Sequence, residues 1–66
     1  MTNYILLIWR MDENMQCMVY SGVIMMLQSV AHQIDKHSRN MEPINQLVVY
    51  KSVVAGEIEV MFKIVL

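Results

Sequence analysis

The chain has 66 residues, one cysteine and a net charge of −1, with no cluster of basic side chains. The single cysteine excludes an internal disulfide and any multi-cysteine zinc site, and the lack of basic clusters disfavours nucleic-acid binding, which depends on neutralised phosphates. Hydrophobic residues make up 56% of what we expect to be one domain, residues 1–66, and this excess over an ordinary globular domain favours oligomerisation or a membrane.

The membrane alternative depends on the stretch from Asn14 to Ile34, which carries no fixed charge and is long enough to cross a bilayer. Polar residues such as Gln28 and His32 interrupt it, so we favour a chain that does not cross. The N-terminus lacks a positive segment, and its apolar run is too short for a signal peptide. We therefore expect a cytoplasmic protein, with Cys17 as a small buried hydrophobic residue.

Two strands are predicted at the N-terminus. Tyr4 to Trp9 is apolar at every position, which is typical of a strand buried on both faces in the middle of a sheet. Asp12 to Asn14 suits a hairpin loop. A return strand then covers Met15 to Tyr20 and directs Met18 and Tyr20 to one face, with Cys17 and Val19 on the other.

Val23 to Ser38 has the spacing of an amphipathic helix. Ser21 is the expected N-cap, and Asn40 suits the left-handed position that ends a helix. The expected buried positions are Val23, Met26, Leu27, Val30 and Ile34. The expected solvated positions are Gln28, Ser29, His32, Gln33, Asp35 and Lys36. A competing interpretation joins residues 15–38 into one long helix, with Gly22 inside it as an unfavourable residue.

The C-terminal third predicts a β-hairpin. Leu47 to Val54 is rich in β-branched residues, Ala55-Gly56 supplies a turn, and Glu57 to Leu66 alternates between apolar and polar side chains. The alternation puts one apolar set on one face: Ile58, Val60, Phe62, Ile64 and Leu66. Glu57, Glu59 and Lys63 fall on the other face, where charge keeps an edge strand soluble.

Together these elements predict an α+β fold of ββαββ order, with a four-stranded antiparallel sheet in the order 2-1-3-4 and one helix on one face. A helix about 10–12 Å wide cannot cover four strands spaced about 4.8 Å apart, and the second sheet face has no cover at all. We expect that uncovered apolar surface to be an interface. The candidate interface residues are Tyr4, Leu6, Ile8, Val48, Tyr50 and Met61.

Sequence alone leaves one assignment open in the first strand: either Tyr4, Leu6 and Ile8 or the alternate set Ile5, Leu7 and Trp9 faces the helix. Trp9 and Tyr50 are the largest side chains of the central strands, and such aromatic residues suit a core as well as an interface.

No catalytic, cofactor or metal site is expected. His32 and His37 fall on different faces of the helix, without partners at a metal-ligand spacing, so both are expected to be solvated. His37, Asp35 and Ser21 contain the residue types of a hydrolytic triad, but their spacing does not bring them together. The isolated Gly22 and Gly56 do not form a phosphate-binding loop.

Three functional hypotheses follow. The first is a non-enzymatic protein-interaction module, expected to be a homodimer, that acts inside the cell as a regulator or inhibitor of another macromolecule, as small accessory proteins of viruses and mobile elements do. The second is a structural subunit of a larger homo-oligomeric assembly. The third is a small enzyme or ligand carrier whose site lies at a dimer seam, where His32, Tyr20 or Tyr50 would meet across subunits.

Overall fold

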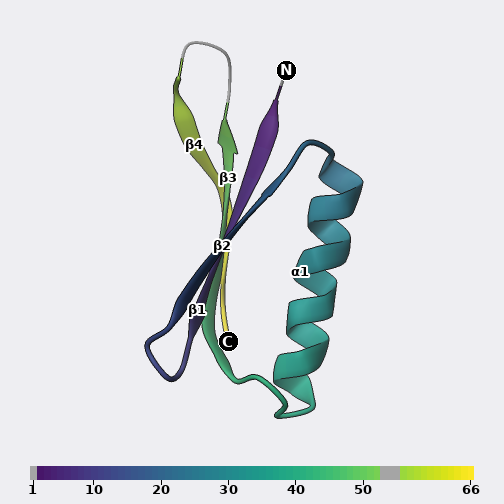
Figure 1. Cartoon of the computed structure of the whole chain (residues 1–66), viewed down its shortest axis with the longest axis vertical. Helices are drawn as coiled ribbons and strands as arrows, with labels where there is room; N and C mark the ends of the chain where they lie inside the picture. Colours follow the sequence, from purple (N-terminus) through teal and green to yellow (C-terminus); the bar gives the residue numbers. More distant parts are fainter. Residues whose placement is uncertain (1, 53–55) are drawn as a thin grey trace.

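The computed structural model describes residues 2–52 and 56–66 of the chain. Within these residues it forms β1 (Asn3–Arg10), β2 (Met15–Tyr20), α1 (Val23–Ser38), β3 (Ile44–Ser52) and β4 (Ile58–Val65). This is the predicted ββαββ order, and the long-helix alternative is wrong because residues 15–20 are a strand (Figure 1). The predicted end of the third strand, Val53 and Val54, and its turn residue Ala55 lie outside the described residues.

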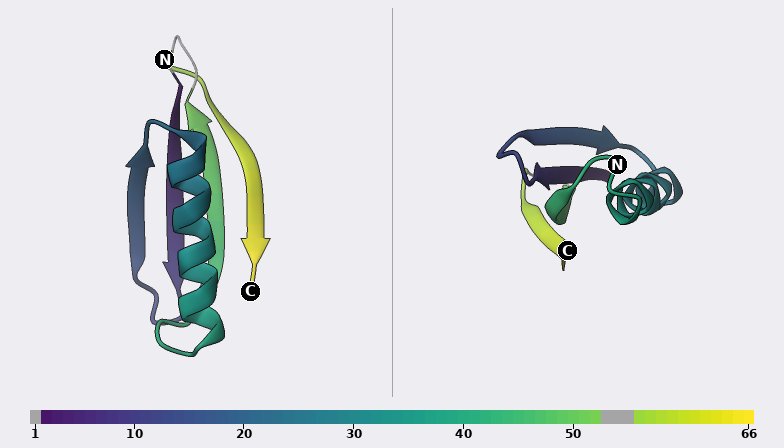
Figure 2. Two further views of the ribbon diagram at one scale, coloured as in Figure 1. Left: turned by 90° about the vertical axis from the view of Figure 1, so that its right-hand side faces the viewer. Right: turned by 90° about the horizontal axis from the view of Figure 1, so that it is seen from below.

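The strands form an antiparallel sheet in the order β2-β1-β3-β4, as predicted from the two doubly apolar strands. Helix α1 lies on one face of this sheet, over β1 and its neighbours, while β4 lies beyond it (Figure 2). The structure measures 38 × 22 × 15 Å, and the shortest of these extents leaves room for two layers. As predicted, α1 therefore leaves part of its own sheet face uncovered, and no described element covers the opposite face.

The β1–β2 loop uses the expected polar residues. The Asn14 backbone N–H donates to Asp12 Oδ1 at 3.1 Å, and the Arg10 N–H donates to the Asn14 carbonyl at 2.9 Å. Glu13 adopts a left-handed conformation, with φ of 71°, which turns the chain back on itself. The loop therefore fixes the register of the first hairpin.

The two ends of helix α1 are capped in different ways. Gly22, not the predicted Ser21, is the N-cap, and no side chain caps the first turn. At the other end Asn40 has φ of 57°, as predicted, and its N–H donates to the His37 carbonyl while the Met41 N–H donates to the Lys36 carbonyl. This pair of bonds is a Schellman motif with asparagine at the left-handed position.

The core lies between α1 and one face of the sheet. Leu6 and Ile8 of β1 are fully buried there, with Leu47 and Val49 of β3. The helix contributes Met26 and Val30 to this cluster. The alternative left open by the sequence is thereby decided, because it is the Tyr4, Leu6 and Ile8 set of β1 that faces the helix.

The helix is rotated relative to the predicted apolar stripe. Gln33, expected to be solvated, is buried, whereas Val23 and Leu27, expected in the core, are exposed. Met26, Val30 and Gln33 fall within seven residues of one another, at a spacing that places them on the same side of a helix. Burying Met26 and Val30 therefore also buries Gln33. The Gln33 Oε1 atom has no hydrogen-bond partner among the described residues.

A β-bulge in β4 changes the predicted faces of that strand. Val49 pairs with Phe62 and the next residue, Tyr50, pairs with Val60, so Met61 is the extra residue without a partner. The bulge splits the predicted apolar face of β4: Phe62 and Ile64 point toward the helix layer, whereas Ile58 and Val60 point to the opposite side. An alternation count cannot detect an extra residue, so this part of the prediction is wrong.

Candidate interaction surface

The face of the sheet opposite α1, here called the open face, consists of rows of cross-strand neighbours, because paired residues point to the same side. Its central row crosses the strands as Cys17, Leu7, Val48 and Lys63. The row on one side is Val19, Ile5, Tyr50 and Val60. The row on the other side is Met15, Trp9, Gln46 and Val65.

Exposure across the open face is high for such apolar residues. Val19 is 64% exposed, Val60 60% and Val65 70%, and Trp9 keeps 38% of its surface in contact with solvent. Val48 is buried by its neighbours within the sheet, in the middle of the face. The described chain therefore presents a nearly continuous hydrophobic layer with no second layer above it, which in a monomer is unusual.

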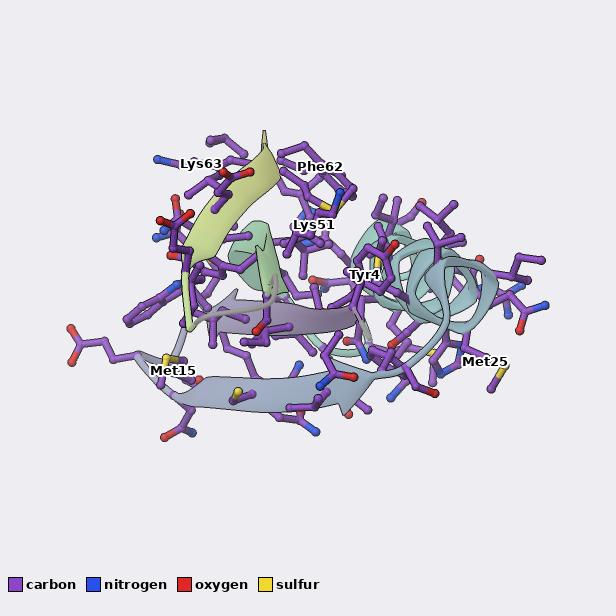
Figure 3. All side chains as sticks on the ribbon, turned by 90° about the horizontal axis from the view of Figure 1, so that it is seen from above. Tyr4, Met15, Met25, Lys51, Phe62 and Lys63 are labelled. Carbon is purple, nitrogen blue, oxygen red and sulfur yellow. The ribbon has the colours of Figure 1, made fainter. Side chains whose placement is uncertain are left out.

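The predicted interface set falls on two faces of the sheet. Val48 and Tyr50 belong to the open face, as expected. The assignment of Tyr4, Leu6 and Ile8 to the same surface is wrong, because these residues pack toward α1 and pair with the helix-side residues of β3. Figure 3 shows Tyr4 on the helix side of the sheet.

Met61, the last predicted interface residue, lies at the bulge and is 43% exposed, without a cross-strand partner. The open-face residues that the prediction missed are Ile5, Leu7 and Trp9, which were the stated alternative for β1. Phe62 and Lys63 lie on opposite sides of β4, with Phe62 toward the helix (Figure 3).

Cys17 was expected to be buried, but it is exposed. It lies on β2, at the edge of the sheet, beside Leu7 on the open face. The reason for the error is the missing layer: a small apolar residue on an edge strand is buried only if something covers that face.

Charge on the open face is sparse. Among the described residues, Lys63 is the single charged side chain in the three rows, and it lies on the edge strand β4. At one end of the face Asn3 of β1 pairs with Ser52 of β3, and both side chains are polar. One lysine gives little attraction for a phosphate backbone.

The residues proposed for a dimer-seam enzyme are spread over different surfaces. Tyr20 faces the helix, and its hydroxyl lies 2.6 Å from Ser29 Oγ, whereas Tyr50 is on the open face and His32 is exposed on α1. Across residues 2–52 and 56–66, no three His, Cys, Asp or Glu side chains gather as a metal site.

His37 is the second histidine expected to be solvated, but it is partly buried and structural. Its Nδ1 atom accepts a hydrogen bond from the Ile44 N–H at 2.9 Å. Asp35, the other member of the triad-like set on the helix, pairs with Arg39 at 3.3 Å. Both side chains therefore have structural partners instead of one another.

A cluster of polar side chains lies at the end of the molecule near the β1–β2 loop. Arg10 donates to Glu42 at 2.9 Å and to Gln16 at 2.7 Å, and Lys36 lies 3.4 Å from the same Glu42 carboxylate. Two shallow hollows of about 440 and 620 Å³ adjoin Arg10. Because these charges already pair with one another, the cluster joins β1, β2, α1 and the α1–β3 loop, and we assign it a structural role.

The β4 edge of the sheet is less suited to association than the open face. The edge strand β4 carries Glu59 and Lys63, and the bulge at Met61 interrupts its regular ladder. Charged residues and bulges are the features by which natural sheets discourage edge-to-edge pairing. The second hypothesis, an assembly built through edge strands or sheet faces, gains no support from the β4 edge, whereas the other edge strand, β2, carries no charged side chain.

Comparisons with known protein families, with curated proteins and with solved structures gave no significant match to this chain. No helix in the described part of the chain has both the length and the apolar character needed to cross a bilayer.

Proposed function

We propose that this chain is a non-enzymatic protein-interaction module that acts by burying its open face against another macromolecule. The observation that carries the proposal is the hydrophobic layer formed by the three rows on the face opposite α1. Burying apolar surface contributes about 25 cal/mol per Å², so a face of this kind favours association over exposure to water. A regulatory or inhibitory role and a cytoplasmic location stay predictions.

The chemistry of the face favours a protein partner. A nucleic acid requires several cations, and the described rows hold one, Lys63. A small-molecule site requires a concave pocket with convergent polar groups, whereas the open face is one side of a sheet whose exposed side chains are mostly apolar.

The experiment is site-specific photocrosslinking in cells that express the chain. A photoreactive phenylalanine analogue replaces Val19 on the open face or, as the control, Gln28, which is exposed on α1. We expect a protein adduct at position 19 that is absent at position 28 and is lost when Leu7→Glu is added. Equal adduct yields at the two positions, or no adduct at position 19, would contradict the proposal.

A further inference from the structure

We infer that the macromolecule on the open face is a second copy of this chain, packed face to face so that β2 of one copy lies over β4 of the other. The inference rests on the proposed function, because it names the partner for the same surface. It is argued from the area of the face, from its charge and from the register of its rows.

The area of the open face suits a two-fold dimer. Four strands about 4.8 Å apart and about 26 Å long give a flat projection on the order of 500 Å². Two copies would bury on the order of 1,000 Å² in total, which is about the minimum area of a biological interface. The contribution of each copy, on the order of 500 Å², is about a tenth of the 4481 Å² surface of the chain, which is the share that a standard interface takes.

Charge favours a copy of the same face as the partner. The rows present no acidic or basic cluster that would need an opposite charge across the interface; their single charge is that of Lys63 in the described residues. An apolar face with a single charge near its edge is largely complementary to itself, and two aligned sheets pack about 10 Å apart through such faces.

The position of Lys63 selects the orientation. Lys63 lies in the central row, level with Val48 and Leu7. A two-fold axis perpendicular to the strands would stack Lys63 on its own copy at one rim of the interface, which places like charges together. An axis parallel to the strands instead puts Lys63 over the partner's Cys17 and leaves the two ammonium groups at opposite rims. It also puts Val19 over the partner's Val60, and Leu7 over the partner's Val48.

Sedimentation equilibrium of the untagged chain tests the dimer. We expect a mass twice the 7.7 kDa of the chain for the wild type. Leu7→Glu should raise the dissociation constant by about 100-fold or more, because a buried unpaired charge in the centre of an interface is strongly unfavourable. Val60→Glu gives a second variant at an exposed position, should Leu7→Glu fail to fold. The control Met25→Glu, on the outer side of α1, should stay dimeric (Figure 3).

Peptide mapping of the Val19 crosslink separates the possible outcomes. An adduct of twice the chain mass, joined to the tryptic peptide that contains Val60 of the second copy, supports the inference with its orientation. A crosslink between the two copies of β2 overturns the two-fold axis parallel to the strands. A monomer whose position 19 captures a different protein overturns the self-association but not the proposed function, and a monomer without any adduct overturns both.

Discussion

His37 joins the end of α1 to the start of β3. Its Nδ1 atom accepts the backbone N–H of Ile44, a residue with no exposed surface. A buried N–H group without an acceptor costs about 1–3 kcal/mol, so this bond matters more than an exposed one would. The sequence did not reveal the role, because a histidine near a helix end looks the same whether it is solvated or bonded to the next strand.

We therefore expect His37→Ala to lower the free energy of unfolding by about 1–3 kcal/mol, because the Ile44 N–H loses its acceptor. The matched control is His32→Ala, on the exposed side of the same helix, which should change stability by less than about 0.5 kcal/mol. Urea unfolding at one fixed protein concentration measures both variants. Equal effects of the two substitutions would show that the His37 bond is not stabilising.

Gln33 shows where side-chain chemistry and helical position conflict. Its amide favours water, yet its spacing from Met26 and Val30 places it on the buried side of α1. Polar type alone predicted a solvated residue, and the rotation of the helix overrode that preference. The rotation depends on how α1 fits β1, β2 and β3 together, which is information that no single segment contains.

At the scale of elements, the order and approximate bounds of the strands and helix were predictable, because apolar runs, alternation and turn residues are local signals. The β2-β1-β3-β4 order followed from the two strands that are apolar on both faces. The bulge at Met61 was not predictable, since an extra residue in β4 becomes visible only through its pairing with β3. That one residue decides which side of the sheet receives Ile58 and Val60.

Gly56, in the β3–β4 connection, allows a test of how backbone conformation affects stability. Gly56 has φ of 78°, a region that costs a residue with a Cβ atom roughly 1–2 kcal/mol. We expect Gly56→Ala to destabilise the protein by about that amount. Gly56→Asn is the matched control, because asparagine adopts the left-handed region more readily than alanine and the position has open space around an added Cβ. Equal thermal shifts for the two variants would contradict the conformational explanation.

At the scale of the whole molecule, it was predictable that part of the apolar sheet surface would have no layer packed on it. The residues that form this surface were not predictable. Length and composition indicated more apolar surface than one helix could bury. Deciding between the two residue sets of β1 needed the register, because both sets are apolar and a strand has a period of two. The candidate surface was therefore predicted as a face: its two β3 residues lie on the open face, but its three β1 residues, the Leu6 set, lie on the helix side in exchange for the Leu7 set.

The central claim is that the open face is covered in the working protein, and Trp9, the sole tryptophan, reports on that face. The most direct measurement is quenching of Trp9 fluorescence by acrylamide, for the wild type and Leu7→Glu across a range of protein concentrations. We expect weak quenching of the wild type that increases on dilution, and strong quenching of Leu7→Glu throughout. Equally strong quenching of both proteins at every concentration would show that the face is bare and would contradict the account.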